Sequence, residues 1–422
     1  DFLKREVRTL AEFKMNLWTP YIEHQFEFRM HPLIAPEGGS LTAQEVRELT
    51  AYARRYHVEI VGCLQSFAHF ANILKHPQYA HLGETDGGWI LRPVSEDSYR
   101  LLGDLYSEIT PAFESPLFNV CCDETQGLGE GKSKALLEAF GIEWLYATHI
   151  NRIHDMLARR GKRMMMWADI ALSHPGILDR IPRDTVMLSW GYHAAETFEP
   201  AIVPIAQRGF AFMVCPGVNC WGRMFPDIDT SLVNIAHYAR DGAKHGALGM
   251  INTCWDDDGE NLFSVNWYSL VFGGDCAWNP GQASAERFAG RYSQCFYGTH
   301  DDSAALANLA LSAAQRHPLS TGMWNRVYWA DPTAPSPTTR DREHQWLADL
   351  QQRAQSVLRQ TGAARASATA NADNLAYLEM TALKLSTLAG RRLAFLQAAD
   401  LYAEAANAAS ADAAVPRLMT AR

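Results

Sequence analysis

Apolar and polar positions alternate along the first two thirds of the chain in two rhythms. At residues 1–14 the apolar side chains Leu3, Val7, Leu10 and Phe13 recur three or four positions apart, as on one face of a helix. Short apolar runs of the kind that forms buried strands follow. Strands are predicted at residues 15–22, 58–67, 117–122, 164–167, 186–190, 210–215 and 248–254. Helices are predicted between them at residues 41–56, 94–109, 142–160, 200–207 and 232–244.

This regular exchange of strands and helices predicts an α/β fold built on a parallel sheet. The strands are apolar along their length, as expected when helices cover both faces of a sheet. Seven strand–helix units preceded by one helix without a strand predict a (β/α)8 TIM-like barrel whose first strand is absent from this chain. That strand would lie just before Asp1. A doubly wound open sheet competes, but the Gly-rich phosphate turn expected after its early strand is not found.

The pattern changes after about residue 281. Helical stretches with many alanines replace the alternation, and the Pro-rich segment at residues 331–339 is predicted to be a linker. We therefore predict a barrel that forms the catalytic domain at residues 1–283, followed by an α-helical C-terminal region at residues 284–422. The helices of that region are predicted at residues 286–296, 302–315, 342–362 and 375–407.

Two adjacent carboxylates, Asp123 and Glu124, end the predicted strand at residues 117–122. In a parallel β/α barrel the C-terminal ends of the strands carry the catalytic groups. Two carboxyl groups in different surroundings can divide acid–base work, one ionised while the other holds a proton. The competing interpretation is a solvated acidic turn, which is common after a strand.

Aromatic and polar side chains also follow the other predicted strands. Tryptophans interleaved with carboxylates at one barrel mouth suit a sugar, because pyranose C–H faces stack on aromatic rings and sugar hydroxyls bond to carboxylates. Each tryptophan taken alone could instead be an ordinary core residue. The predicted strand ends supply Glu23, His69, Trp167, Asp169, Trp190, Tyr192, Asn219, Trp221, Trp255, Asp257 and Glu260.

Composition limits the partners of the chain. With 422 residues, 47% hydrophobic and 20% charged, it has the make-up of an ordinary globular protein with a large core. The net charge of -9 argues against a nucleic-acid partner. No run of about 18 apolar residues predicts a membrane span. Most cysteines sit inside apolar runs and form no CxxC pair, which favours a reducing compartment such as the cytoplasm.

A metal site could draw on His69, Asp123 and Glu124, which are residue types that ligate metal ions. No HExxH-like spacing supports such a site, however, so we predict neither a metal nor another cofactor.

Three stretches resemble a known enzyme family. They are residues 14–26 (KMNLWTPYIEHQF), residues 65–69 (QSFAH) and residues 74–82 (LKHPQYAHL). They resemble the family 20 glycoside hydrolases, the β-N-acetylhexosaminidases, and the last two are most similar to the hexosaminidase D branch. Asp123 and Glu124 then fall where that family keeps its catalytic Asp–Glu pair. The resemblance covers roughly residues 1–280.

The chain departs from the family pattern at three places. Cys121 and Cys122 stand where the family often has two glycines, and Ala68 replaces the usual glycine before the histidine of strand three. The arginine of strand one, which grips sugar hydroxyls in the family, has no counterpart because that strand is absent. We expect these differences to affect substrate preference more than the class of reaction.

The resemblance implies exo-acting, retaining hydrolysis of terminal β-linked GlcNAc or GalNAc by substrate-assisted catalysis. The 2-acetamido oxygen of the substrate would attack the anomeric carbon and form an oxazolinium ion. Glu124 would protonate the leaving oxygen and then activate water, while Asp123 would orient the acetamido N–H. Tyr192 would hold the acetamido oxygen, and His69 would tune Glu124 with the help of Glu23. The other predicted substrate contacts are Trp167, Asp169, Trp190, Asn219, Trp221, Trp255, Asp257 and Glu260.

Two other functions stay open. One is a non-catalytic carbohydrate-binding barrel that keeps the pocket but has no turnover. The other is a retaining glycosidase with two distant carboxylates, such as Glu124 and Asp257, which needs no acetamido group. The expected partner is a glycan or glycoconjugate that contains N-acetylhexosamine. The choice between GlcNAc and GalNAc, and between a monomer and a homodimer, is left open by the sequence.

Overall fold

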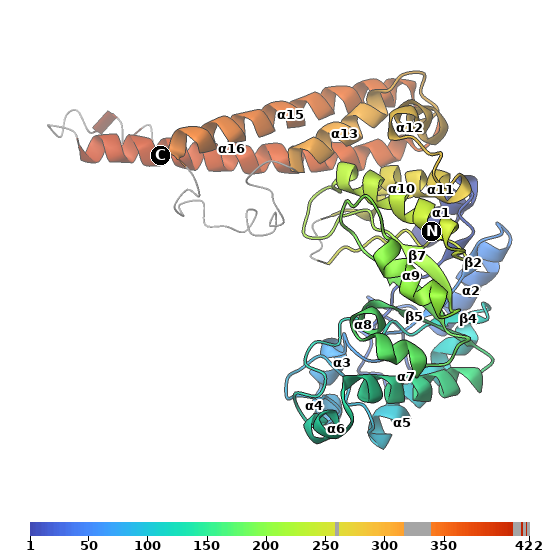
Figure 1. The fold of residues 1–422 in the computed structure, drawn as a ribbon. Coiled ribbons are helices and arrows are strands. Elements are labelled where there is room, and N and C mark those ends of the chain that lie inside the picture. Colours follow the sequence, from blue (N-terminus) through green and yellow to red (C-terminus); the bar gives the residue numbers. More distant parts are fainter. Residues whose placement is uncertain (258–260, 316–338, 408–414, 417–418, 420–422) are drawn as a thin grey trace.

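The computed structural model describes residues 1–257, 261–315, 339–407, 415–416 and 419 (Figure 1). The described chain is an α/β protein with short parallel strands in its N-terminal part and long helices in its C-terminal part. Figure 1 shows the two parts in contact, with the longest helices reaching away from the strands.

All strand pairings in the two sheets are parallel. β1 (Leu17–Trp18) pairs with β2 (Glu59–Ile60), and a single residue, Val61, separates β2 from β3 (Gly62–Cys63). The larger sheet has the order β3-β4-β5-β6-β7, which is also the order along the chain. Because a doubly wound sheet reverses its strand order, this observation excludes the competing fold. Its further strands are β4 (Leu117–Asn119), β5 (Arg163–Trp167), β6 (Val186–Trp190) and β7 (Ala211–Cys215).

Helices separate the strands as predicted. α2, for example, begins with a capping box in which Thr42 accepts a bond from the Glu45 N–H and the Glu45 carboxylate accepts one from Thr42. Six helices lie close to the predicted ranges: α1 (Phe2–Glu12), α2 (Ala43–Arg54), α5 (Glu96–Ile109), α7 (Ile142–Ala158), α9 (Glu199–Gln207) and α10 (Ile228–Lys244). Five other helices were not predicted: α3 (Ala71–Leu74), α4 (Pro77–Ala80), α6 (Lys134–Phe140), α8 (Asp169–Ser173) and α11 (Trp267–Trp278).

The strand predicted at residues 248–254 is not continuous, which corrects the prediction. Met250 and Thr253 form only isolated parallel bridges, to Val214 and Gly217. The reason is Pro216, because proline has no N–H with which to donate the next bond of the ladder. The bonds on either side are present: Ile251 N–H donates to the Val214 carbonyl at 3.0 Å, and Thr253 N–H donates to the Pro216 carbonyl at 2.8 Å.

The C-terminal helical region is confirmed. α15 (Arg340–Ser367) and α16 (Leu375–Ala406) lie side by side (Figure 1). They share an apolar core with α10, in which Ile235, Leu347 and Leu378 are buried. Residues 331–338 of the predicted linker lie outside the described residues. No helix among the described residues is long and apolar enough to cross a membrane. The remaining helices here are α12 (Ala285–Tyr292), the π-helix Ser293–Tyr297 and α13 (Ser303–Gln315).

Close packing at the start of β3 leads to a stability prediction. A Cβ atom on Gly62 would lie 2.6 Å from the ring of Phe118 and 2.8 Å from that of Phe113. We expect Gly62→Ala to lower the free energy of unfolding by about 1–3 kcal/mol through overpacking. Urea denaturation measures the effect.

Gly103→Ala, in the middle of α5, is the matched control. Its Cβ would meet only Met156 at 3.5 Å, an ordinary contact. Because alanine favours helix, this change should be neutral or stabilising by up to about 1 kcal/mol. Equal unfolding midpoints for the two variants would contradict the packing argument.

Candidate active site

Asp123 and Glu124 leave β4 through an unusual stretch of backbone. Cys121, Cys122 and Glu124 all have positive φ angles, of 60°, 65° and 50°. Left-handed backbone is costly for residues other than glycine, and such strain is often found at functional sites. It also turns the chain out of the extended form, in which adjacent side chains would point to opposite faces. Both carboxyl groups can therefore face the same space.

Hydrogen bonds from buried groups hold this turn. Cys121 N–H donates to the Asn119 side chain at 2.9 Å, and the Tyr146 hydroxyl donates to the Cys122 carbonyl at 2.7 Å. Glu124 N–H donates to the Asp169 carboxylate at 3.0 Å. The left-handed conformation at residues 121–122 is one that glycine adopts freely, which fits the two glycines expected at this place in the family.

The two carboxyl groups lie in different surroundings. The Asp123 side chain is 14% exposed and the Glu124 side chain is 42% exposed. Burial raises the pKa of Asp123 to about 6, and a hydrogen bond from Gln65 partly offsets this rise. The Gln65 amide donates to Asp123 Oδ1 at 2.9 Å. One carboxyl group is thus enclosed and held, while its neighbour is open to an approaching molecule.

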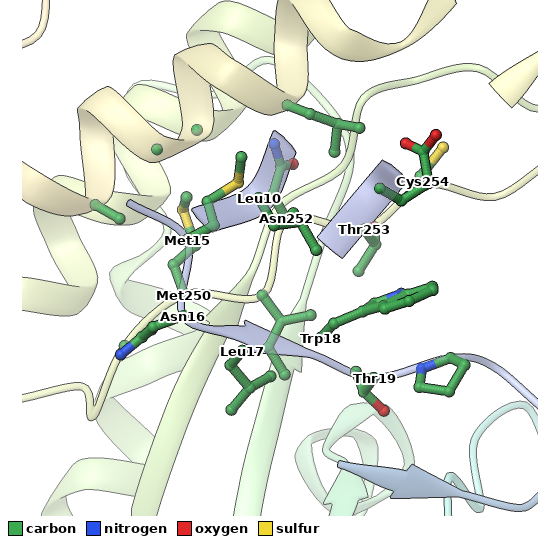
Figure 2. A pocket seen from close by; sticks show the side chains of 18 of the residues that line it. Leu10, Met15, Asn16, Leu17, Trp18, Thr19, Met250, Asn252, Thr253 and Cys254 are labelled. Atoms are coloured by element: carbon green, nitrogen blue, oxygen red, sulfur yellow. The ribbon is translucent and has the colours of Figure 1, made fainter. Parts of the chain in front are cut away.

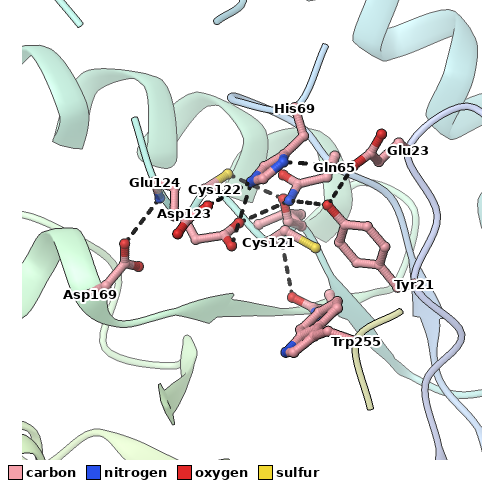
Figure 3. A network of polar contacts seen from close by, with 12 residues as sticks. Tyr21, Glu23, Gln65, His69, Cys121, Cys122, Asp123, Glu124, Asp169 and Trp255 are labelled. Atoms are coloured by element: carbon pink, nitrogen blue, oxygen red, sulfur yellow. Dashed lines mark hydrogen bonds and ion pairs between the residues drawn. The ribbon is translucent and has the colours of Figure 1, made fainter. Parts of the chain in front are cut away.

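A polar network joins the pair to the ends of β1 and β3 (Figure 3). Gln65 donates a second bond to the Tyr21 hydroxyl at 3.0 Å, and that hydroxyl donates to Glu23 at 2.9 Å. His69 lies between the acids, with Nδ1 3.6 Å from Glu23 and Nε2 3.6 Å from Glu124 and 3.8 Å from Asp123. Its Nε2 atom is buried and has no hydrogen-bond partner among the described residues.

Asp169 follows β5, as predicted, and one of its oxygens accepts the backbone N–H of Glu124 at 3.0 Å. Its contact with sugar hydroxyls stays a prediction. Burial raises the pKa of Asp169 to about 6, and the bond from Glu124 partly offsets this effect. Asp169 therefore supports the carboxylate pair from the first turn of α8.

Aromatic side chains form a continuous wall beside the pair. Trp255 Nε1 donates to the Tyr192 hydroxyl at 2.8 Å. The Tyr192 ring stacks on Trp190 at 5.0 Å and lies 5.1 Å from Trp221. The Asn219 amide donates to the Tyr192 carbonyl at 2.9 Å. The structure thus brings four of the predicted residues together around a fifth, Tyr192.

Trp167, Asp257 and Glu260 are the three further residues predicted at the strand ends. Trp167 contacts Trp255 at 6.1 Å but is only 3% exposed, so most of it belongs to the core. Asp257 is exposed in the turn that follows Trp255. Glu260 lies outside the described residues.

Three residues of the site were not assigned from the sequence. Gln65 donates a hydrogen bond to Asp123, and Tyr21 donates one to Glu23. Both lie near the C-terminal ends of predicted strands, which is where catalytic groups are expected in a β/α barrel. Trp89 lies in a loop that no sequence pattern marked, and its ring packs against that of His69 with 4.6 Å between the centroids.

The site also has the composition of a metal-binding group. Ligand atoms of His69, Asp123 and Glu124 all lie within 4.8 Å of one another. One imidazole nitrogen and two carboxylates could hold a divalent cation. Since acids without a metal also cluster in this way, the geometry does not by itself assign one.

Comparison with known proteins places this geometry in a family. Residues 19–221 match the family model described as glycosyl hydrolase family 20, catalytic domain. The beta-hexosaminidase of Vibrio furnissii is 24% identical over 50% of this chain and 36% of its own length. Hexosaminidase D of Bos taurus is 27% identical over 41% of this chain and 53% of its own length. The chain thus spans about half or less of these relatives.

A solved structure shows the same fold. The β-N-acetylhexosaminidase of Bacteroides fragilis superposes with a TM-score of 0.57 at 16% identity, covering 69% of this chain and 65% of that one. The resemblance predicted from residues 14–26 and 65–82 is confirmed by these matches. Residues 19–221, which include the Asp123–Glu124 pair, therefore match the catalytic domain of glycosyl hydrolase family 20.

Proposed function

We propose that this protein is an exo-acting, retaining β-N-acetylhexosaminidase that removes terminal β-linked GlcNAc or GalNAc from a glycan. The observation that carries the proposal is the adjacent Asp123–Glu124 pair, with one carboxyl group enclosed and the other open. Adjacent residues cannot flank a glycosidic bond as separate acid and nucleophile, so a nucleophile supplied by the substrate fits them better. The names of the relatives, hexosaminidases, agree with this substrate class.

Glu124 is the proposed acid and base. It would donate its proton to the leaving oxygen as the acetamido oxygen attacks the anomeric carbon, and it would then take a proton from water as the oxazolinium ring opens. His69 Nε2, 3.6 Å from the Glu124 carboxylate, is placed to influence both proton transfers. Retention follows because the anomeric carbon is attacked twice, each time with inversion.

Asp123 is the proposed partner of the acetamido group. Gln65 occupies its Oδ1 atom, which leaves Oδ2 to accept the acetamido N–H. The ionised carboxylate would also offset the positive charge of the oxazolinium ion in a poorly solvated setting. Tyr192 would hold the acetamido oxygen by donating its hydroxyl hydrogen, since the bond from Trp255 uses only a lone pair of the hydroxyl oxygen.

The proposed architecture is a (β/α)8 barrel at residues 1–283 that lacks its first strand in this chain, followed by a helical region at residues 284–422. Support comes from seven parallel segments that follow the chain order, from β1 to the bridged residues 250–253, when β2 and β3, which only Val61 separates, count as one. Trp190, Trp221 and Trp255 would stack on the sugar at the barrel mouth.

A panel of nitrophenyl glycosides tests the proposed reaction. We expect release of nitrophenol from β-GlcNAc or β-GalNAc and none from β-glucose, which has no acetamido group. On an unactivated GlcNAc disaccharide, Glu124→Gln should lower kcat by about 10²–10⁴-fold, the usual worth of a general acid. Glu130→Gln, at an exposed position in the next loop, is the control and should behave as wild type.

Three results would count against this function. Hydrolysis of the glucoside would favour two distant carboxylates, and no hydrolysis at all would favour a binding protein. Wild-type rates for Glu124→Gln on the disaccharide would remove Glu124 from its role.

Asp123→Asn tests the acetamido contact. The change keeps the shape of the side chain but removes the charge, and charge-assisted hydrogen bonds are roughly twice as strong as neutral ones. We expect kcat on the GlcNAc substrate to fall about 10²-fold or more, with a smaller change in KM, because the contact strengthens in the transition state. Asp86→Asn, at an exposed loop position, is the control. A rise in KM with unchanged kcat would contradict the role.

The raised pKa of Asp123 gives a pH prediction. If the ionised form is the active one, kcat/KM should rise with pH through the pKa of Asp123, which is about 6. Gln65→Met removes a bond that favours the ionised form, so the acid limb should move to higher pH. Gln78→Met, exposed on α4, should leave the limb in place. An acid limb that stays fixed, or moves to lower pH, in Gln65→Met would refute the assignment.

A further inference from the structure

Two pairs of cysteine thiols lie in contact in the described part of the chain. Cys220 Sγ is 3.7 Å from Cys254 Sγ, and Cys63 Sγ is 3.4 Å from Cys121 Sγ. The proposed reaction uses none of these four thiols. Two sulfur atoms this close can form a disulfide when a small shift brings them to about 2.05 Å from each other. Access to an oxidant therefore decides which pair can react.

Access favours the pair of Cys220 and Cys254. Cys254 is partly exposed and lines a cavity of about 770 Å³ (Figure 2). Cys63 and Cys121 are both buried, and burial raises the pKa of Cys121 well above the ordinary value of a thiol. A buried thiol that stays protonated is a poor nucleophile. We therefore expect this second pair to resist oxidation.

The contacts of Cys220 and Cys254 give the two thiols different roles. The Cys220 S–H donates to the Trp255 carbonyl at 2.7 Å. Cys254 Sγ accepts a hydrogen bond from the Asn266 amide at 3.1 Å. The contact with Cys254, together with burial, raises the pKa of Cys220 well above the ordinary value. Cys254 is therefore the thiol that an oxidant reaches first, and Cys220 is the thiol that can resolve the product.

Both thiols belong to loops that carry the aromatic wall. Cys220 stands directly before Trp221 in one loop, and Cys254 stands directly before Trp255 in the other. Trp255 donates to the Tyr192 hydroxyl, and the Tyr192 ring lies 5.1 Å from Trp221. A disulfide would bring the two sulfur atoms closer by about 1.7 Å and would remove the hydrogen that Cys220 donates to Trp255. It would therefore change how the two loops hold Tyr192.

We propose that hydrogen peroxide converts Cys220 and Cys254 into a disulfide that displaces the aromatic wall and slows turnover. Cys254 Sγ attacks one peroxide oxygen, which forms a sulfenic acid and releases one water that takes up the Cys254 proton. Cys220 Sγ then attacks the sulfenic sulfur. The S–S bond forms as the sulfenic hydroxyl leaves with the Cys220 proton as a second water. The two thiols thus lose two electrons and two protons, and hydrogen peroxide is reduced to two waters.

The disulfide itself is independent of the proposed catalysis, whereas its effect on hydrolysis rests on the proposed function. Tyr192 is the residue proposed to hold the acetamido oxygen, and a displacement of about 1 Å can lower a rate by about 10²-fold. We therefore expect oxidation to lower kcat on nitrophenyl β-GlcNAc by roughly tenfold or more. Reduction with dithiothreitol should restore the rate, because a disulfide is reversible while higher oxides of cysteine are not.

The test treats the full chain with a small excess of hydrogen peroxide and then blocks the remaining thiols with N-ethylmaleimide. Tandem mass spectrometry of the tryptic peptides 209–223 and 245–287 locates the bond, since these peptides also contain Cys215 and Cys276. We expect a bond between Cys220 and Cys254 in most of the protein. Dithiothreitol added before the block should abolish it.

Cys220→Ser is the test variant, because serine keeps a hydroxyl that can donate to the Trp255 carbonyl. It should lose both the disulfide and the sensitivity of hydrolysis to peroxide. Cys254→Ser, at the partly exposed position, repeats the test if Cys220→Ser does not fold. Cys63→Ala, which removes one thiol of the other pair, and Cys295→Ser, which removes an exposed thiol, are the matched controls. Both controls should keep the disulfide and the sensitivity.

A reversible bond between Cys220 and Cys254, with a reversible loss of hydrolysis, supports the proposal. No disulfide, a bond that joins other cysteines, or a disulfide that leaves the rate unchanged would overturn it. Formation of the disulfide in a protein that hydrolyses no glycoside even when reduced would support the thiol pair and count against the proposed function.

Discussion

The left-handed turn of the backbone from Cys121 to Glu124 is the constraint on which the site depends. Without it, two neighbouring side chains at the end of a strand would point to opposite faces of the sheet. Each non-glycine residue in that conformation costs of order 1–3 kcal/mol, so the surrounding structure must hold it. Asn119, Tyr146 and Asp169 do so, and they come from three different elements of the fold.

This constraint also explains how two identical functional groups become different. Of the two side chains that the turn brings together, Asp123 is the more enclosed, and there Gln65 binds it and burial raises its pKa. Glu124 lies nearer to solvent, with nearly half of its side chain exposed. A division of labour between adjacent carboxyl groups therefore arises from backbone geometry, and His69 and Glu23 then extend it into a network.

Most of the fold could be predicted from the sequence because buried parallel strands and amphipathic helices leave different apolar patterns. The prediction of a continuous strand at residues 248–254 was wrong, because one missing hydrogen-bond donor decides the outcome. Residues 248–254 are as apolar as a strand, but the missing N–H of Pro216 interrupts their ladder. That effect belongs to the neighbouring segment, so the pattern within residues 248–254 cannot reveal it.

The site was predictable for residues whose chemistry is unusual at a strand end, such as the Asp123–Glu124 pair. It was less predictable for residues whose role depends on which neighbour they meet. Asp169 follows β5 as expected, but its carboxylate accepts a backbone N–H of the β4 loop. Gln65 and Tyr21 have ordinary side chains, and only their contacts with Asp123 and Glu23 mark them as part of the site.

The order of the strands has a consequence for how this chain folds. Since β3 to β7 follow one another in the sheet as they do along the sequence, each strand pairs with a neighbour that has already been made. Contacts between segments close in sequence form faster, because less loop entropy is lost. The sheet can therefore grow strand by strand in the order of the chain. The long pair α15 and α16 is made after the strands and completes a core that α10 has already begun.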